Sequence, residues 1–252
     1  MRLGMIIDTR RCYGCLACVV ACKAANATPP GHFRCKVKIG EKGKFPNSTQ
    51  TFLPTLCNHC EDAPCIRVCP TGASYRDKDG VVRVDADKCI GCQMCMNACP
   101  YDARSFYTDP NPSYWKDEGH GPDEYEKLRY KEHKFNTPDK CDFCADRRAQ
   151  GLPPACVATC AGRARIFGDL DDPNSEIAKM MKKYNPKPLN PELKTKPRVF
   201  YITDEKNCPV ELLEGHKAKA KEVQPTGLLR KKHDEDFGGD ILTPLPSPPK
   251  VN

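Results

Sequence analysis

Cysteine is the residue type whose spacing points most directly to chemistry. The chain has 18 cysteines among 252 residues, and sixteen of them fall into four short runs in which most neighbours are two or three residues apart. A chain of this length is not a small disulfide-stabilised domain, and disulfide frameworks are rarely spaced in this way. The runs are Cys12-x2-Cys15-x2-Cys18-x3-Cys22, Cys57-x2-Cys60-x4-Cys65-x3-Cys69, Cys89-x2-Cys92-x2-Cys95-x3-Cys99 and Cys141-x2-Cys144-x11-Cys156-x3-Cys160.

The third run, with Pro100 after its last cysteine, reproduces the bacterial ferredoxin pattern that binds an iron–sulfur cube. Three thiolates two residues apart can bind three corners of one cube, whereas a fourth cysteine three residues further on binds a neighbouring cube. Zinc is the alternative, but a structural zinc site uses two cysteine pairs and has no need for a third cysteine at the same step. Only the fourth run resembles the two cysteine pairs of a structural zinc site. Its similarity to the other three runs favours iron–sulfur chemistry there too.

Composition indicates that apolar packing alone cannot hold this chain together. Leu, Ile, Val and Phe make up about 18% of the residues, below the level of roughly 20% at which disorder becomes a serious interpretation. The formal net charge of +7 is too small to complete the signature of a disordered chain. We therefore expect bound cofactors to hold the fold together.

No segment predicts a membrane helix or a secretory signal. The longest unbroken apolar run, Leu16–Cys22, has seven residues, whereas a membrane helix needs about 20. Residues 1–8 contain only a short apolar stretch before Asp8, so they lack the apolar region of a signal peptide. We expect no direct membrane span and no export signal in this chain.

An internal repeat sets the expected positions of the structural elements. The last three runs are followed by short strand-like stretches at 74–76, 104–107 and 165–167, and Val81–Val84 completes a hairpin with the first of these. Leu16–Asn26 is the best predicted helix. The predicted fold class is α+β, with tandem bacterial-ferredoxin-like modules of short hairpins and helices around four iron–sulfur cubes. The expected parts are residues 1–50 with 136–180, residues 51–107, an aromatic insert at 108–135 and an extended proline-rich tail at 181–252.

The insert and the tail lack apolar periodicity. The insert carries Tyr114, Trp115, Tyr125 and Tyr130, and it is either a solvated loop or a docking surface, since Tyr and Trp are enriched at interfaces. The tail should be ordered only where a partner holds it. Residues 179–252 contribute +5 of the net charge, and four oxidised cubes would add about −8 elsewhere. A nearly neutral holo-protein gives no support for nucleic-acid binding.

The residues outside the runs form no recognisable site for substrate chemistry. The sequence has no Ser–His–Asp set, no phosphate-binding glycine loop and no paired acids that stand out, so we expect no catalytic residues. Cys35 and Cys208 are interpreted as buried or free thiols. His59, between Cys57 and Cys60, either donates a hydrogen bond to a cube sulfur, which would tune its reduction potential, or only shapes its loop.

Residues from about Met5 to Pro173 resemble the four-cluster ferredoxin-like electron-transfer subunit of the molybdenum-pterin oxidoreductases of the dimethyl sulfoxide reductase family. That family includes dimethyl sulfoxide, polysulfide, thiosulfate, tetrathionate and arsenate reductases and related formate dehydrogenases. The resemblance rests on Cys57–Cys65 (CNHCEDAPC), Asp87–Cys92 (DKCIGC) and Phe167–Pro173 (FGDLDDP). Cys92 stands where nitrate-reductase-type subunits have an aromatic residue and a three-iron centre, which implies four 4Fe-4S clusters here.

The rule that a fourth cysteine binds a neighbouring cube predicts how the runs pair. The second and third runs should exchange their last cysteines, which leaves the first and fourth to pair, and the family resemblance implies the same arrangement. The predicted iron ligands are Cys12, Cys15, Cys18 and Cys160 (cluster 1); Cys57, Cys60, Cys65 and Cys99 (cluster 2); Cys89, Cys92, Cys95 and Cys69 (cluster 3); and Cys141, Cys144, Cys156 and Cys22 (cluster 4).

The sequence thus predicts a non-catalytic subunit that relays electrons between a molybdenum-pterin catalytic subunit and a quinone-linked membrane subunit or a soluble carrier. The alternative is the equivalent relay of a formate dehydrogenase or hydrogenase. A structural zinc protein and a free-standing ferredoxin are rivals from other classes. We expect assembly in the cytoplasm, followed either by export to the periplasm with a signal-bearing partner or by retention in the cytoplasm.

Overall fold

A four-stranded sheet joins three distant parts of the chain. The computed structural model describes residues 1–130 and 133–204, all of them within the compact unit Met1–Ala218; a second unit, Lys219–Asn252, lies outside the described residues. The strand order is β8-β1-β10-β9, with β10 parallel to β1 and β8 antiparallel to it. The strands are β1 (Leu3–Asp8), β8 (Arg165–Asp169), β9 (Lys187–Pro188) and β10 (Val199–Ile202).

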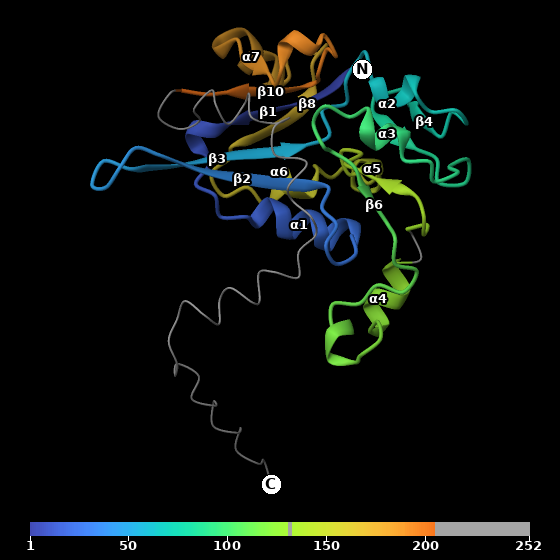
Figure 1. The fold of residues 1–252 in the computed structure, drawn as a ribbon. Helices are drawn as coiled ribbons and strands as arrows, with labels where there is room; N and C mark the ends of the chain where they lie inside the picture. The colour runs from blue at the N-terminus through green and yellow to red at the C-terminus, as the bar shows by residue number, and fades with distance from the viewer. Residues whose placement is uncertain (131–132, 205–252) are drawn as a thin grey trace. The chain divides into compact units, whose positions relative to one another are not determined.

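The middle strand of this sheet is buried on both faces. All six residues of β1 are buried, and successive side chains of a strand point to opposite faces. Met5 and Ile7 belong to the main core, in which many cysteines also lie. On the other face, α7 (Glu176–Tyr184) covers β1 and β8 (Figure 1). The small apolar cluster under α7 consists of Ile6, Ile166, Ile177 and Ile202.

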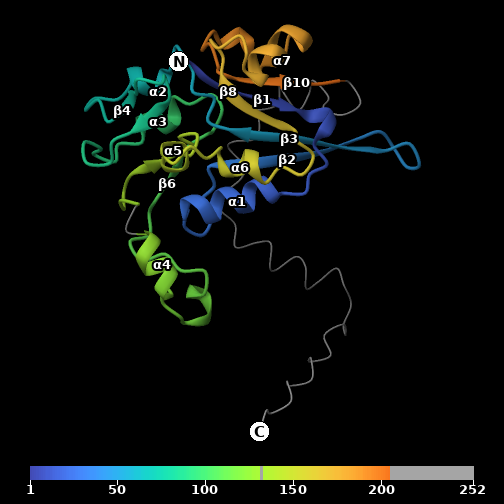
Figure 2. The same cartoon turned by 180° about the vertical axis from the view of Figure 1, so that it is seen from behind.

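A long hairpin and one helix lie on the cysteine-bearing side of the sheet. β2 (Cys35–Lys42) pairs antiparallel with β3 (Thr49–Leu56) along the full length of both strands. α1 (Ala17–Asn26) packs against β2 and against α6 (Ala155–Ala158), as the view from behind shows (Figure 2). The predicted helix at 16–26 is confirmed, and the hairpin at 35–56 was not predicted.

The remaining elements are short, and most of them lie around the second and third cysteine runs, whereas α5 follows Cys144 of the fourth run. The predicted hairpin is confirmed, because β4 and β5 pair in antiparallel fashion, and β6 pairs with β7. α2 packs against α3. Their bounds are α2 Pro64–Arg67, β4 Ser74–Arg76, β5 Val82–Val84, α3 Met94–Asn97, β6 Ser105–Phe106, β7 Pro138–Asp139 and α5 Ala145–Ala149.

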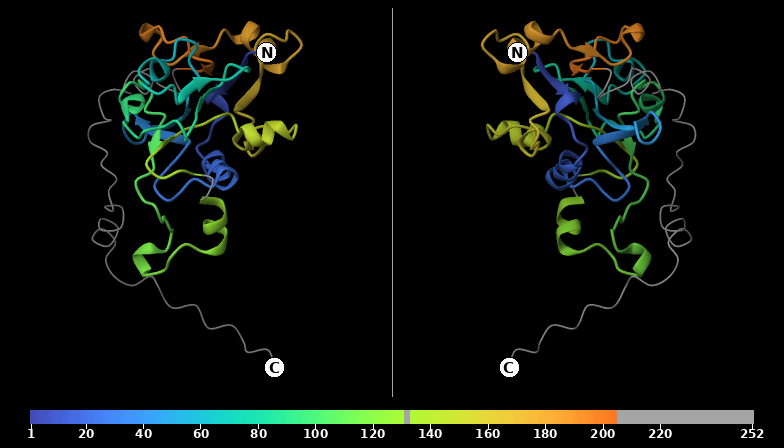
Figure 3. Two further views of the ribbon diagram at one scale, coloured as in Figure 1. Left: turned by 90° about the vertical axis from the view of Figure 1, so that its right-hand side faces the viewer. Right: turned by 90° about the vertical axis from the view of Figure 1, so that its left-hand side faces the viewer.

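The aromatic insert contains the helix α4 (Glu124–Arg129) and contacts the end of α1 (Figure 3). A capping box starts α4, in which the Asp123 carboxylate accepts from the backbone N–H of Glu126 and the Glu126 side chain accepts from that of Asp123. The Tyr125 hydroxyl donates to the carbonyl of Ala24 at 3.1 Å. The insert is therefore tied to the C-terminus of α1, where a helix leaves carbonyl groups unpaired.

The start of the tail predicted from the sequence differs from the structure. An extended tail starting at residue 181 is wrong for 181–204, because α7 continues to Tyr184 and β10 pairs with β1. The reason is that Val199–Ile202 is an apolar run that completes the buried sheet, despite the prolines before it. Residues 205–252, with Cys208, lie outside the described part. No helix in the described part is long and apolar enough to span a membrane.

Candidate functional site

Each cysteine run opens with a turn of the same backbone conformation. The residue before the second cysteine has a positive φ in every run, at Gly14 (72°), His59 (44°), Gly91 (73°) and Phe143 (56°). This turn directs backbone N–H groups to the first cysteine: Gly91 donates to Sγ of Cys89 and Phe143 to Sγ of Cys141, both at 3.4 Å. Such hydrogen bonds favour the charged, metal-binding form of a thiol.

A helix begins just before the third cysteine of every run. That cysteine is the second residue of α1, α2, α3 and α6. The fourth cysteine follows four residues later, inside α1 but two residues beyond the end of α2, α3 and α6. In α1 the two cysteines lie one turn apart on the same helix face. The third and fourth cysteines are Cys18 and Cys22, Cys65 and Cys69, Cys95 and Cys99, and Cys156 and Cys160.

The structure brings the cysteines together in sets of four. Three sets each line a cavity and take three cysteines from one run and one from another. These are site 1 (Cys12, Cys15, Cys18, Cys160), site 4 (Cys22, Cys141, Cys144, Cys156) and site 3 (Cys69, Cys89, Cys92, Cys95). Site 2 consists of Cys57, Cys60, Cys65 and Cys99, where the other three thiols act electrostatically on Cys60. Cys35 also lines the site 4 cavity, and that each set binds a cluster stays a prediction.

The buried thiols of these sets need a positive charge beside them to ionise. Burial raises the pKa of Cys22 to about 12, and the nearby thiols of Cys156 and Cys144 add to the shift. Burial likewise raises the pKa of Cys60 to about 12 and that of Cys99 to about 11. Bound iron ions would supply the missing positive charge and keep these cysteines as thiolates. Within residues 1–130 and 133–204, no three Cys, His, Asp or Glu side chains are grouped as tightly as a single metal ion requires.

Arg104 is a buried hydrogen-bond donor without a partner, and an anionic group at these sites would supply one. Arg104 is 4% exposed, and neither its Nη1 nor its Nη2 has a hydrogen-bond partner in the structure. The thiols of Cys65 and Cys95 are the groups that most favour its charge. An unpaired buried polar group costs about 1–3 kcal/mol. Sulfur atoms of a thiolate-bound iron cluster accept N–H hydrogen bonds, so the residues present fit such a cluster.

His59 is fully buried and lies between two of the sites. Its imidazole stacks on the ring of Phe143, with the ring centroids 3.8 Å apart. Burial first, and then the charges of Lys140 and Arg198, hold the pKa of His59 well below its usual value. Nδ1 accepts from the backbone N–H of Val82 at 3.2 Å, so the neutral ring carries its proton on Nε2, which has no partner in the structure. Both sequence-based roles of His59 remain open.

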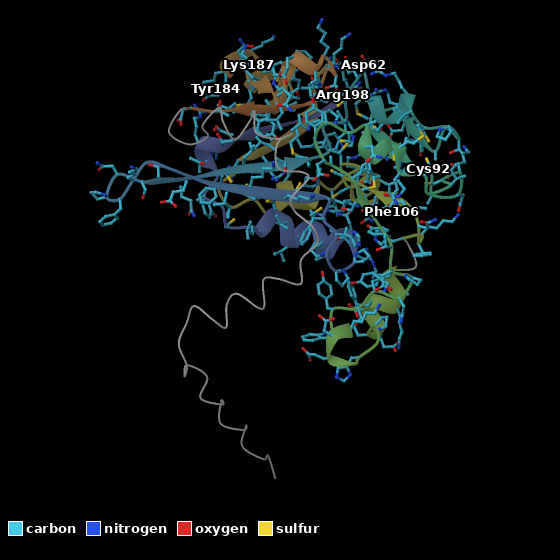
Figure 4. All side chains as sticks on the ribbon, in the orientation of Figure 1. Asp62, Cys92, Phe106, Tyr184, Lys187 and Arg198 are labelled. Atoms are coloured by element: carbon cyan, nitrogen blue, oxygen red, sulfur yellow. The ribbon has the colours of Figure 1, made fainter. Side chains whose placement is uncertain are left out.

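The four sites differ in their exposure to solvent. All four cysteines of site 4 are buried. Cys15 of site 1 and Cys92 of site 3 are exposed, and Figure 4 shows Cys92 beside α3. Large apolar side chains are exposed near both of these cysteines, with Tyr13 and Val20 near site 1 and Ile90 and Met94 near site 3. Sites 1 and 3 are therefore the ones closest to the protein surface.

Sequence reasoning missed the polar side chains that touch the ligands. Asn26 Nδ2 lies 3.5 Å from Sγ of Cys22 and 3.7 Å from Sγ of Cys144. Arg165 Nη2 lies 3.5 Å from Sγ of Cys18 and 3.0 Å from Sγ of Cys35, which is buried. One signal could have found the arginines, because the internal repeat places Arg104 and Arg165 at the same distance after a cysteine run.

Comparisons with known proteins agree with this chemistry. A family model described as "4Fe-4S dicluster domain" matches residues 48–114 and 122–170. The iron–sulfur subunit of an arsenate respiratory reductase from Shewanella sp. (strain ANA-3) is 43% identical over 230 residues, covering 80% of this chain and 96% of that protein. A subunit of the selenate reductase of Mesobacillus selenatarsenatis is 43% identical over 208 residues, covering 79% and 71%. A polysulfide reductase chain of Wolinella succinogenes is 38% identical over 208 residues, covering 81% and 96%.

Proposed function

This protein belongs to the family of iron–sulfur electron-transfer subunits of molybdoenzyme reductase complexes, and we propose that its four cysteine sets hold four 4Fe-4S clusters. It carries electrons in such a complex and is not itself the catalytic subunit. The relatives are subunits of reductases, so the relay of a formate dehydrogenase or hydrogenase is not favoured. The same membership argues against a structural zinc protein and a free-standing ferredoxin.

The membership of the sites is the observation that carries the proposal. Each site combines three cysteines of one run with the last cysteine of another, as expected for paired bacterial-ferredoxin cubes. Sites 1 and 4 exchange Cys160 and Cys22, and sites 2 and 3 exchange Cys99 and Cys69. We infer two tandem modules from this exchange. The boundary expected at residue 50 falls within β3, so we place the first module at 1–56 with 136–180 and the second at 57–107.

The sixteen cysteines would hold the clusters through their thiolates. When bound, each 4Fe-4S cluster accepts and gives up one electron. The chain contributes the ligands, the backbone N–H donors of the turns and a dry interior, and these set the reduction potentials. The His59 Nε2–H, which is buried without a partner, is available to a sulfur atom at site 2 or site 4.

We infer a linear order of sites 1, 4, 2 and 3. Sites 1 and 4 are adjacent because α1 carries Cys18 and Cys22. The stack of His59 on Phe143 supports the adjacency of sites 4 and 2, since each ring belongs to the loop of one site. Sites 2 and 3 share the contact between α2 and α3. The two exposed sites then lie at the ends of the order, where electrons can enter and leave.

The two exposed ends of this order indicate where partner subunits would bind. A catalytic subunit is implied by the relatives, which are subunits of reductase complexes. We propose that it contains the molybdenum-pterin centre and contacts one exposed end. A quinone-linked membrane subunit or a soluble carrier would exchange electrons at the other end. The exposed apolar side chains around Cys15 and Cys92 suit such contacts, since apolar side chains form the cores of protein interfaces.

Iron and sulfide analysis tests the number of clusters. Anaerobically purified complex should contain about 16 iron atoms per chain, because four cubes of four irons each are expected. Cys141→Ser removes a ligand of site 4 and should reduce the iron content by about one cube. Cys208→Ser is the matched control, since Cys208 belongs to none of the four cysteine runs. Near eight irons in the wild type, or stoichiometric zinc, would contradict the proposal.

A further inference from the structure

Two arginines occupy equivalent positions in the internal repeat. Arg104 follows the last cysteine of the third run by five residues, and Arg165 follows the last cysteine of the fourth run by five. The equivalent residues after the first and second runs are Ala27 and Ser74. Arg104 is 4% and Arg165 is 3% exposed. Each pair of sites, 1 with 4 and 2 with 3, therefore contains one buried arginine.

Arg165 lies between sites 1 and 4. Its Nη2 is 3.5 Å from Sγ of Cys18, a site 1 cysteine, and 3.0 Å from Sγ of Cys35. Its Nη1 is 3.7 Å from Sδ of Met5. The thiol of Cys156, which belongs to site 4, is also among the groups that most favour its positive charge. The guanidinium thus acts on one cysteine of each site.

Arg104 stands in the same relation to sites 2 and 3. The groups that most favour its charge are Cys65 of site 2 and Cys95 of site 3. Its two terminal nitrogens have no hydrogen-bond partner in the structure. In all four sites the cysteine beside the arginine is the third of its run, at the second residue of its helix. The repeat thus places one arginine against corresponding ligands in both modules.

These two arginines differ from Arg34, a partly buried arginine that is already neutralised. Arg34 forms ion pairs with Asp139 at 2.7 Å and Asp142 at 3.4 Å. Among the residues that the structure describes, the groups that most favour the charges of Arg104 and Arg165 are thiols and, for Arg165, the Tyr201 hydroxyl, with no carboxylate among them. A buried charge without a counter-charge is strongly unfavourable. An anionic, thiolate-bound group at the sites would supply that counter-charge.

A fixed positive charge acts on the two oxidation states differently. Reduction adds one electron, breaks no bond and makes the thiolate-bound cluster more negative. A guanidinium remains protonated throughout, and in a low-dielectric interior it attracts the more negative state more strongly. The reduced form is stabilised and the reduction potential rises.

We propose that Arg104 and Arg165 are redox-tuning residues, each a single buried cation shared by two adjacent cluster sites, which raises the reduction potential of both. The inference rests on the proposed function, because it requires clusters at the four sites. Arg165 acts on sites 1 and 4, and Arg104 acts on sites 2 and 3. Sharing one cation shifts both potentials of a pair in the same direction.

EPR-monitored redox titration of the intact complex tests the assignment. Arg165→Met should lower the reduction equilibrium constant of sites 1 and 4 at least tenfold, a shift of about 59 mV for one electron, and leave sites 2 and 3 unchanged. Arg104→Met should show the reverse pattern. Cys→Ser variants at Cys12, Cys57, Cys89 and Cys141 assign each signal to its site. Arg165→Lys and Arg104→Lys, which keep the charge, should retain most of the wild-type potential.

Arg11→Met is the matched control, since Arg11 lines the site 1 cavity but is exposed, and solvent screens exposed charges. It should shift the potential much less than Arg165→Met. An unchanged potential in both buried variants, a shift at all four sites, or an equal shift in the control would overturn the proposal. If Arg165→Met or Arg104→Met fails to bind iron, a normal iron content in the corresponding lysine variant supports the charge argument. A low iron content in the lysine variant contradicts it. The wild-type iron content tests the proposed function separately.

Discussion

The residue before the second cysteine differs between the exposed and the buried sites. It is glycine at sites 1 and 3, although all four positions have a positive φ. A Cβ on Gly14 would lie 2.2 Å from the ring of Phe52, and one on Gly91 would lie 2.7 Å from the Asn136 amide. At sites 2 and 4 the same position carries His59 and Phe143, whose rings stack in the interior. At sites 1 and 3 the missing side chain thus leaves room for a close neighbour, whereas at sites 2 and 4 the side chain packs in the core.

Gly14→Ala should disrupt site 1, because the added methyl group meets an aromatic ring in addition to the unfavourable backbone conformation. The iron content should fall by about one cube, and the EPR signal assigned with Cys12→Ser should disappear. Gly72→Ala is the matched control, since Gly72 has a φ of 68° and open space at its Cβ. Retention of the site 1 signal in Gly14→Ala would show that the close contact does not matter.

Cys160→Ser tests the exchange of ligands between runs. Cys160 lines the site 1 cavity, although its own run supplies site 4. The variant should disturb the site 1 signal, as Cys12→Ser does, and leave the site 4 signal in place. EPR redox titration of the three variants Cys12→Ser, Cys141→Ser and Cys160→Ser makes the comparison. If Cys160→Ser behaves like Cys141→Ser, the proposed wiring is wrong.

At the scale of elements, α1 connects the cluster sites to the aromatic insert. It carries Cys18 and Cys22, and three of its last carbonyl groups accept hydrogen bonds from the insert. The donors are the Tyr125 hydroxyl, Arg129 Nη2 and His133 Nε2, and the acceptors are the carbonyl groups of Ala24, Ala25 and Asn26. The insert holds this end of α1 and still exposes large apolar side chains, among them Trp115 and Leu128.

Trp115→Ala should weaken binding to the catalytic subunit about tenfold or more, because exposed tryptophans are frequent interface hot spots. The iron content should remain unchanged, since the side chain is half exposed and is part of no site. Titration of the catalytic subunit against the variant measures the affinity. Phe45→Ala is the control, as Phe45 is 94% exposed at the tip of the β2–β3 hairpin. Equal affinities for the wild type and Trp115→Ala would exclude the insert as a docking surface.

The whole molecule is held together by segments that are distant in sequence. β1 pairs with β8 and β10, which follow it by more than 150 residues. Seven of the 20 buried residues described in the main core are cysteines, and six of these belong to the four sites. We therefore expect cluster binding and folding to be coupled, as in metal-dependent domains that lack a preformed core.

Removal of iron should destroy the tertiary structure. The chelated chain loses the bonds that join the runs. Leu, Ile, Val and Phe make up only about 18% of the chain, which is too little apolar surface to replace those bonds. Near-UV circular dichroism should collapse, and amide exchange in β1 and β10 should become fast. Anaerobic reconstitution with iron and sulfide serves as the control and should restore both signals. A chelated chain with slow exchange in these strands would contradict the coupling.

The cysteine runs determined the chemistry from the sequence alone, because ligand spacing is local. Three thiolates at a two-residue step need only one turn and one helix start, and both are encoded within a few residues. The helix at 17–26 and the hairpin at 74–84 were predicted for the same reason. The family resemblance was likewise carried by short local motifs.

Tertiary structure alone decided the features that depend on distant pairing. The parallel contact of β10 with β1 could not be read from the sequence, because a four-residue apolar strand has no local signal for its partner. For the same reason the tail was predicted to begin too early. The internal repeat places Arg104 and Arg165 at equivalent positions, but their role depends on burial against thiols, which only the tertiary structure shows. Local spacing fixes which ligands are available, whereas long-range packing fixes which charges face them.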